Sequence, residues 1–470
     1  MLKEVDILLI NPPFHSRSGS SKIFPLGLGY IISSVNKNGF SYEVIDCTQI
    51  ISSYYEDELH LLKEKLSEKL KEYNPLIVGI GPCVTTQVKA LKIIADCCKA
   101  NYNSQTIFAG GPLASIEGQE WFFYDYLGIN YIVKGDGEYA IANAISYIKE
   151  GKKLGDCPNV SHANNSFYNF VSDIDSISFP TRLYIDDISV SVRRQSDDST
   201  RKVASMITSR GCPYNCSYCV SGNLPYKKFR KRSNQNIIAE VKLLYEKHSI
   251  DDIIFYDDCF FYNPNQVNID IENFCNNLLN VTTDITWQIE LRVDVIMQMD
   301  LESVLLLEKS GCRQINLGIE KSNDISLKML EKNISLNDLS QKIEMIKNNT
   351  KIKLAGTFIL GGKDEKESDV LDIIHYAKSL KLDFAHFSPL FIYPGTPLYK
   401  DFFNNDREWV DYIINDSLPW GEIVFENKYI NKKRLIELAE SAYFEFYKNT
   451  PYYESMMVND RFNLRGRPNI

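Results

Sequence analysis

The pattern of apolar and polar positions predicts a first series of alternating strands and helices. Segments such as 26–37, 56–71 and 84–99 carry apolar residues at intervals of three and four, which is typical of amphipathic helices. They alternate with apolar runs of strand length, which end at turns rich in Gly or Pro or at polar segments: 5–10, 42–45, 76–80, 106–109 and 131–133. This alternation favours an open, doubly wound parallel sheet, whose ligand lies beyond the carboxyl ends of the strands.

A second series of strands and helices follows a polar connector. Its six apolar runs alternate with amphipathic helices and lie at 203–208, 252–256, 286–291, 314–319, 353–360 and 384–390. Six strand–helix units are too few for the usual eight-stranded barrel, but they suit a partial (β/α)6 barrel of the TIM type. The site of such a barrel lies at the carboxyl ends of its strands.

Together the two series predict an α/β protein with four segments. We expect a Rossmann-like doubly wound domain, a connector, a partial barrel and a small, mainly helical C-terminal region, at residues 1–148, 149–198, 199–400 and 401–470. Within the last segment, residues 432–447 form an amphipathic helix pattern. The length of 470 residues agrees with this division, since about 100–200 residues usually form one domain.

Composition and charge limit the classes of partner. The hydrophobic fraction of 44% and the charged fraction of 24% are ordinary for a soluble globular protein. No stretch reaches the about 18 consecutive apolar residues of a membrane span, and the first ten residues read as a strand rather than as a signal peptide. A net charge of -9 disfavours nonspecific nucleic-acid binding. We therefore expect a cytoplasmic protein with reduced thiols and without nucleic-acid or membrane partners.

Three cysteines form the strongest motif in the sequence. Cys212, Cys216 and Cys219 follow the first strand of the second series with the spacing Cys-x3-Cys-x2-Cys. Three thiolates on one loop can hold three irons of a four-iron cluster and leave the fourth iron open to another ligand. Structural zinc is an alternative, but it usually takes four ligands as two pairs, and only the isolated His248 and Cys259 could complete such a set. A chance group of buried thiols is the remaining alternative.

This loop resembles the signature of the radical S-adenosylmethionine (SAM) enzymes, with Tyr218 in their aromatic position. The resemblance continues at the later strand ends, in Ile253-Ile-Phe-Tyr-Asp257-Asp258, Glu290-Leu-Arg292-Val-Asp, Asn316-Leu-Gly-Ile-Glu320-Lys-Ser322, Thr357-Phe-Ile-Leu-Gly361 and Pro394-Gly-Thr-Pro-Leu. In that family the open iron binds the amino and carboxylate groups of SAM. The resemblance therefore implies a [4Fe-4S] cluster on the three cysteines, and SAM contacts by Tyr218, Asp257, Asp258, Arg292, Glu320, Ser322 and Gly361.

Four segments of the first domain carry a narrower resemblance: Asn11-Pro-Pro, Pro25-Leu-Gly-Leu, Gly110-Gly-Pro and Lys134-Gly-Asp-Gly-Glu138. With them the chain resembles the cobalamin-binding class of radical SAM enzymes and, within it, the class B methyltransferases. The resemblance implies cobalamin contacts by Asn11, Pro12, Pro13, Thr85, Thr86, Gly110, Gly111, Gly135, Gly137 and Glu138. Taken singly, these glycines are also explained by tight turns between strands and helices.

The cobalt ligand is a separate question. The Asp-x-His-x-x-Gly motif of base-off, His-on cobalamin proteins is absent from the sequence, so we expect cobalamin without a histidine on cobalt. His15, in the loop after Asn11-Pro-Pro, is the alternative ligand.

A basic run, Lys227-Lys-Phe-Arg230-Lys-Arg232, follows the cysteine loop and either is solvated or faces an anionic group of the substrate or of SAM.

The resemblance implies a cobalamin-dependent methyltransferase. Such an enzyme methylates an unactivated carbon, or phosphorus, of a small-molecule biosynthetic intermediate through a 5′-deoxyadenosyl radical and methylcobalamin, and it takes electrons from an external donor such as a flavodoxin or ferredoxin. Radical rearrangement, cyclisation or ring contraction is the alternative within the class. A noncatalytic iron–sulfur or zinc regulator is the alternative outside it, which the segments beyond the cysteines disfavour.

Overall fold

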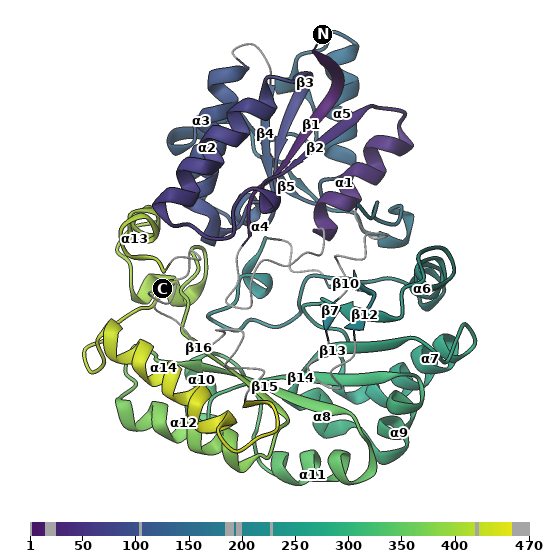
Figure 1. Ribbon diagram of the computed structural model, residues 1–470, viewed down its shortest axis with the longest axis vertical. Coiled ribbons are helices and arrows are strands. Elements are labelled where there is room, and N and C mark those ends of the chain that lie inside the picture. Colours follow the sequence, from purple (N-terminus) through teal and green to yellow (C-terminus); the bar gives the residue numbers. More distant parts are fainter. Residues whose placement is uncertain are drawn as a thin grey trace. The chain divides into compact units, whose positions relative to one another are not determined.

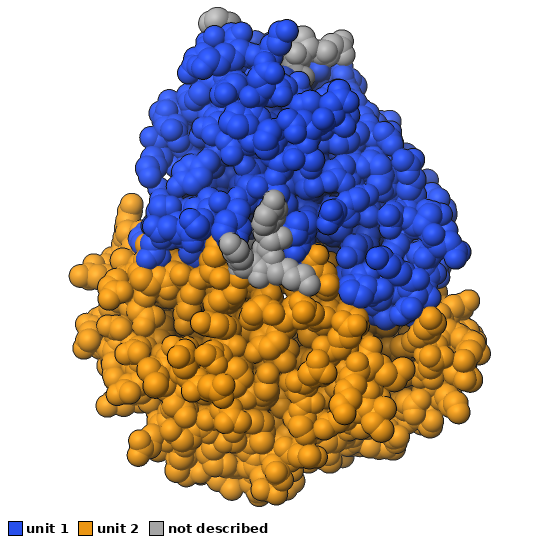
Figure 2. All heavy atoms as spheres, turned by 180° about the vertical axis from the view of Figure 1, so that it is seen from behind, with its two compact units in different colours: residues 1–183, 224–226, 393–423 blue, residues 184–223, 227–392, 424–470 orange. Residues whose placement is uncertain are grey.

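The computed structural model describes residues 2–14, 25–102, 106–183, 192–193, 200–225, 229–418 and 423–453. The chain folds into two compact units, which Figure 2 shows in different colours. The first unit comprises residues 1–183, 224–226 and 393–423, and the second comprises residues 184–223, 227–392 and 424–470. Among the described residues, no helix is both long enough and apolar enough to cross a membrane.

The first unit is built on a parallel six-stranded sheet with the order β2-β1-β3-β4-β5-β6 (Figure 1). Its strands are β1 Lys3–Asn11, β2 Tyr42–Asp46, β3 Tyr73–Ile80, β4 Thr106–Gly110, β5 Tyr131–Gly135 and β6 Tyr168–Asn169. The helices between them are α1 Leu26–Lys37, α2 Glu56–Leu70, α3 Val88–Asn101, α4 Pro112–Ser115 and α5 Glu138–Lys149. Helices α2 and α3 contact each other, as do α1 and α5, and the two pairs cover opposite faces of the sheet. The predicted doubly wound α/β fold is confirmed.

Strand β1 is continuously apolar and buried over residues 7–10 because both faces of the sheet are covered there. Ile7 and Leu9 belong to a buried cluster with side chains of α1 and α5, among them Ile32 and Ala144. The strand order reverses between β1 and β3, so the connections from these two strands leave in opposite directions. A crevice at the carboxyl ends of such a pair is the usual ligand site of an open α/β sheet.

The second unit contains a parallel six-stranded sheet with the order β16-β15-β14-β13-β12-β9. The strands are β9 Val203–Met206, β12 Asp252–Phe255, β13 Thr286–Arg292, β14 Cys312–Glu320, β15 Lys353–Leu360 and β16 Phe384–Pro389. The helices of this unit are α6 Asn234–His248, α7 Val267–Leu279, α8 Val293–Gln298, α9 Leu301–Lys309, α10 Asp324–Met329, α11 Leu339–Asn349, α12 Glu367–Ser379 and α14 Lys432–Tyr447. Six parallel strands with intervening helices confirm the predicted partial barrel.

Among the described strands, β16 pairs only with β15, and α14 covers its other edge. The hydroxyl of Tyr447 accepts a hydrogen bond from Ala385 N (2.9 Å) and donates one to Ala385 O (3.0 Å). One helical turn earlier, the hydroxyl of Tyr443 accepts from Phe387 N (3.1 Å). Two tyrosine hydroxyls thus satisfy backbone groups that a further strand would otherwise pair.

Part of the predicted connector adds a strand that the sequence pattern did not indicate. Residues Tyr168–Asn169 pair with β5, and the Asn169 amide donates to Lys134 O (3.1 Å) and Asn159 O (2.9 Å). A strand of two residues carries no apolar period, so one polar side chain fixes it instead. Two short antiparallel pairs complete the described structure, β7 Val192–Arg193 with β8 Thr200–Arg201, and β10 Ser209–Arg210 with β11 Arg230–Lys231.

Candidate functional site

The cluster loop, defined here as residues 211–223, follows the first strand of the second sheet and carries the three cysteines. The side-chain amide of Asn223 closes it by donating to Cys216 O (3.0 Å) and Cys219 O (2.7 Å). A Cβ at Gly222 would lie 2.1 Å from Tyr214 O, so only glycine fits there. The roles of Gly222 and Asn223 were not predicted from the sequence, because their partners are backbone atoms that any sequence would supply.

The three thiols differ in their surroundings. Cys216 is buried, whereas Cys212 and Cys219 are half-buried. Burial raises the pKa of Cys216 and Cys219, while a hydrogen bond with Cys259 lowers the pKa of Cys212 to about 7. Arg292 lies against this group and donates from Nη1 to Cys216 Sγ over 3.9 Å.

These thiols suit a polynuclear cluster. Among the described residues, no three His, Cys, Asp or Glu side chains converge so as to hold a single metal ion. In a four-iron cluster each thiolate binds a different iron, so three thiols need only surround a common volume. The three cysteines lie within eight positions of one loop, and Arg292 contacts one of the sulfurs, so this loop is the candidate holder of such a cluster.

Tyr218 connects the cluster loop to the end of β14. Its hydroxyl donates to Glu320 Oε1 (3.2 Å), and Lys332 Nζ donates to the same oxygen (2.8 Å) and to Gly318 O (2.9 Å). Glu320 adopts a left-handed backbone (φ 70°) where the register of β14 and β15 shifts. Burial and the charge of Glu320 raise the pKa of Tyr218. Lys332 was not singled out from the sequence, since nothing local marks it as the partner of Glu320.

The two adjacent carboxylates after β12 have different environments. Asp257 Oδ1 accepts from Thr208 N (2.8 Å), Thr208 Oγ1 (2.9 Å) and Ser209 Oγ (2.5 Å), and its other oxygen has no hydrogen-bond partner within the described part of the chain. Burial raises the pKa of Asp257 to about 6. Asp258 is exposed and accepts from Ser221 Oγ of the cluster loop (2.8 Å). Of the pair, Asp258 is the more exposed carboxylate, and Asp257 keeps one oxygen without a partner among the described residues.

The end of β15 is held by a buried lysine. Lys321 Nζ donates to Ile359 O (3.0 Å) and Gly361 O (3.3 Å) and pairs with Glu365. Gly361 has φ 82°, and a Cβ there would lie 2.9 Å from a methyl carbon of Leu435. Ser322 follows directly after Lys321, so the predicted SAM residues all lie on the cluster loop or at the carboxyl ends of strands β12 to β15.

The predicted cobalamin residues gather at the carboxyl edge of the first sheet. They lie at or just after the ends of four strands: Asn11, Pro12 and Pro13 after β1, Thr85 and Thr86 after β3, Gly110 and Gly111 at β4, and Gly135, Gly137 and Glu138 at β5. Asn11 Nδ2 donates to Asp46 Oδ1 (2.8 Å) across the strand ends. His15 and Lys227 lie outside the described residues.

Two of these glycines are required by protein atoms alone. Gly111 has φ 121°, and a Cβ there would lie 2.5 Å from Cys83 N. Gly135 has φ 77°, and its Cβ would lie 2.2 Å from Asn169 O. At Gly110, in contrast, an added Cβ would make only ordinary contacts, the nearest at 3.5 Å. The tight-turn interpretation therefore accounts for Gly111 and Gly135, and their contact with cobalamin stays a prediction.

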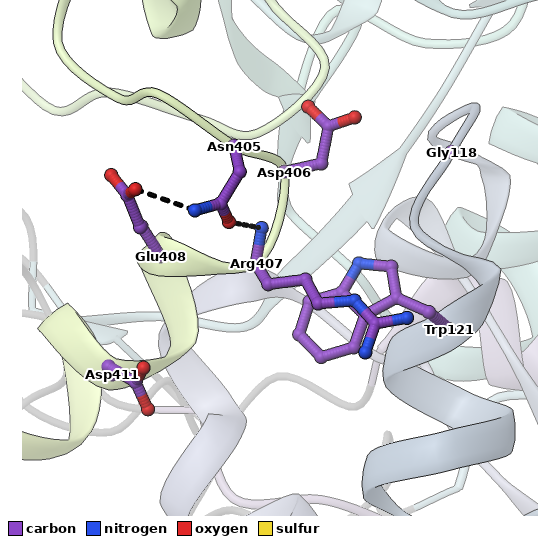
Figure 3. Close-up of a pocket in the computed structure, with 7 residues that line it drawn as sticks. All are labelled: Gly118, Trp121, Asn405, Asp406, Arg407, Glu408 and Asp411. Atoms are coloured by element: carbon purple, nitrogen blue, oxygen red, sulfur yellow. Dashed lines mark hydrogen bonds between the residues drawn. The ribbon is translucent and has the colours of Figure 1, made fainter.

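A surface pocket of about 720 Å³ in the first unit is formed by other residues (Figure 3). The Arg407 side chain extends along the Trp121 ring, with 4.9 Å between the guanidinium carbon and the ring centroid, and pairs with Asp125 (3.1 Å). The remaining lining residues are Gly118, Asn405, Asp406, Glu408 and Asp411. None of the predicted cofactor residues lines this pocket.

Two family models match the chain. The model described as the radical SAM superfamily matches residues 206–377, and the model described as the B12 binding domain matches residues 18–145. The first covers the cluster loop and the strand ends of the second unit, and the second covers most of the first sheet.

Relatives span nearly the whole chain. An uncharacterized methyltransferase of Pyrococcus horikoshii is 27% identical over 99% of this chain and 96% of its own length. An anaerobic magnesium-protoporphyrin IX monomethyl ester cyclase of Rubrivivax gelatinosus is 21% identical over 97% of this chain and 80% of its own length. The solved structure of the radical SAM methyltransferase TsrM from Kitasatospora setae superposes with a TM-score of 0.62 at 19% identity, over 83% of this chain and 74% of that chain, and it supports the fold.

Proposed function

Because residues 206–377 match the radical SAM superfamily and residues 18–145 match the B12 binding domain, we propose that the chain is a cobalamin-dependent radical SAM methyltransferase. Its target would be an unactivated carbon, or phosphorus, of a small-molecule biosynthetic intermediate. The observation that carries this proposal is the union of both domains in one chain that aligns end to end with a relative named a methyltransferase. The radical SAM match over residues 206–377 also argues against a noncatalytic regulator.

The residues of the second unit would position the cluster and SAM. When bound, these groups supply a 5′-deoxyadenosyl radical, and cobalamin supplies the methyl group. Cys212, Cys216 and Cys219 would hold the cluster, and an external flavodoxin or ferredoxin would reduce it. The proposed SAM residues are Tyr218, Asp257, Asp258, Arg292, Glu320, Ser322 and Gly361. Hydrogen bonds from the cluster loop to Glu320 and Asp258 support this assignment, since they hold both carboxylates beside the cysteines.

The first unit would bind cobalamin in the base-off form at the carboxyl edge of its sheet, without a histidine on cobalt. The strand-order reversal between β1 and β3 supports this position. Electron paramagnetic resonance of the cob(II)alamin form should then show no nitrogen hyperfine splitting. Splitting that disappears in His15→Ala would identify His15 as the ligand instead.

The methyl transfer can be tested before the substrate is known. The reconstituted protein is given cobalamin, a strong reductant and SAM with a trideuterated methyl group. We expect trideuteromethylcobalamin with S-adenosylhomocysteine, and 5′-deoxyadenosine as the second product of SAM. With the true substrate, the product should gain an intact trideuteromethyl group. Formation of 5′-deoxyadenosine without S-adenosylhomocysteine would contradict the proposal.

A second candidate function is radical cyclisation, rearrangement or ring contraction. It is supported by the relative named a cyclase, which aligns with 97% of this chain. The same experiment separates the two functions, because cyclisation leaves the carbon count of the product unchanged. Methylation adds one carbon and three deuterium atoms.

A further inference from the structure

Arg292 is the last residue of β13 and lies against the sulfur of one proposed cluster ligand. Its Nη1 donates to Cys216 Sγ (3.9 Å), and its guanidinium carbon lies 3.5 Å from the centroid of the Tyr214 ring. The side chain is 12% exposed, so water screens its charge only weakly. A guanidinium stays protonated at any working pH, so this position always carries a positive charge.

Two neighbours fix the orientation of this guanidinium. Asp294 accepts from Arg292 Nε (2.9 Å) and Nη2 (3.1 Å), which leaves Nη1 for the sulfur. The Tyr214 ring beneath it is held in turn, because the Tyr214 hydroxyl donates to Tyr262 O (2.9 Å). The guanidinium is therefore preorganised toward Cys216 by a bidentate carboxylate and a stacked ring.

A second cation lies near the cysteines but is already paired. Lys332 Nζ donates to Glu320 Oε1 (2.8 Å), and both side chains are buried. Arg292 is hydrogen-bonded to a proposed ligand sulfur itself, whereas Lys332 donates to Glu320 and to a backbone carbonyl.

We propose that Arg292 and Asp294 are positioning residues that set the reduction potential of the cluster. Reduction adds one electron, and hence one negative charge, to the cluster and its thiolates. A cation hydrogen-bonded to the Cys216 sulfur stabilises this reduced form and raises the potential, since hydrogen bonds to the sulfurs and local charge set the potentials of iron–sulfur clusters. Asp294 holds the cation in place and offsets part of its charge. This inference rests on the proposed function, which assigns the cluster to the three cysteines.

The test is a dithionite titration of the reconstituted cluster in the absence of SAM, followed by electron paramagnetic resonance. The variants are R292Q, R292K and D294N. We expect the midpoint potential to shift to more negative values in R292Q, to shift to more positive values in D294N, and to lie between R292Q and the unmodified protein in R292K. Shifts of opposite sign distinguish electrostatic tuning from a general loosening of the loop. R434Q, which removes the exposed pair of Arg434 with Glu367 in the same unit, is the control that leaves the potential unchanged.

Equal midpoint potentials in the unmodified protein, R292Q and D294N, with full iron content, would overturn the inference. If R292Q does not retain iron, R292K and D294N decide. If R292Q keeps the original potential and full iron content, the inference is wrong, and a lost spectral response to SAM would then show that Arg292 acts on SAM alone. Failure of the unmodified protein to bind a four-iron cluster would instead overturn the proposed function.

Discussion

Cys212, Cys216 and Cys219 lie on one loop, and each is expected to bind a different iron. Replacing any one of them by Ala should remove most of the iron and all cleavage of SAM, because two thiolates hold a cluster poorly. Iron analysis and the visible absorption of the anaerobically reconstituted variants measure this loss.

Cys97 and Cys98 are the matched controls, since both are buried in the first unit. As small apolar side chains of α3 they contribute to packing, so their Ala variants should keep the iron content. A Cys216→Ala protein with full iron loading would contradict the assignment of the cluster.

Asp257 makes stability depend on pH. Burial raises its pKa to about 6 in the folded protein, against about 3.9 in an unfolded chain, so the folded state binds the proton more tightly. Its contribution to stability is complete below about pH 4 and is lost as the pH rises through 6. Asp257→Asn cannot ionise, so relative to the unmodified protein it should gain on the order of 1–3 kcal/mol between pH 5 and pH 7.5.

Urea unfolding of both proteins at the two pH values measures this gain. Asp372→Asn, an exposed position on α12, is the control and should follow the unmodified protein. Parallel stability–pH curves for Asp257→Asn and the unmodified protein would show that Asp257 is ionised throughout.

At this scale the sequence indicates candidate ligands but not the side chains that support them. The cysteines and Glu320 stand in motifs whose spacing is local. Tyr218 and Glu320, in contrast, meet across 102 positions, and Lys332 joins them from a segment without any motif. Such partners depend on how the strand ends converge, which one sequence does not specify.

At the scale of elements, one side chain closes the cluster loop. Asn223→Ala removes both hydrogen bonds to the carbonyls of Cys216 and Cys219. Two hydrogen bonds of about 0.5–1.5 kcal/mol each correspond to a factor of about 5 to 150, so this variant should lose iron to a chelator at least about five times faster. Asn277→Ala, which removes an exposed hydrogen bond within α7, should lose iron at the original rate. Equal rates in both variants would show that Asn223 does not hold the loop.

Elements with a clear apolar pattern were predicted closely, whereas the two-residue strands were not. Helices α1 and α14 and strand β15 have the predicted bounds, because each presents a full apolar face. Strand β6 was not predicted, since its two residues are fixed by the side-chain amide of Asn169 and not by an apolar pattern.

At the scale of the whole molecule, the order of strands and helices predicted both sheets. It did not predict that residues 393–423 belong to the first unit. Trp409 Nε1 donates to Gln119 Oε1 (2.8 Å) across 290 positions, and this buried contact has no counterpart in the local pattern. Contacts at that separation arise from the packing of the finished fold.

The hydrogen bonds between the tyrosines of α14 and the backbone of β16 contribute to the stability of the whole second unit. Tyr447→Phe leaves Ala385 N and Ala385 O without their side-chain partner in a fully buried site. Each of the two unmet backbone groups costs about 1–3 kcal/mol, so the free energy of unfolding should fall by about 2–6 kcal/mol. Urea unfolding measures the loss. Tyr429→Phe, at a residue that is 48% exposed, should change stability by less than about 0.5 kcal/mol. Equal values for the two variants would refute the role of the hydroxyl.

The cover that α14 places on the edge of β16 also bears on edge-to-edge aggregation of the protein. An uncovered sheet edge offers its backbone to any passing strand, which is how edge-to-edge aggregation begins. Tyr443 and Tyr447 occupy those backbone groups with side chains, and a hydroxyl cannot propagate a sheet. Truncation of the chain before α14 would expose this edge, so we expect the truncated protein to aggregate even though its proposed cofactor residues are all retained. Helix α14 thus covers an edge at which a strand of another copy could otherwise pair, although it contributes none of the proposed cofactor ligands.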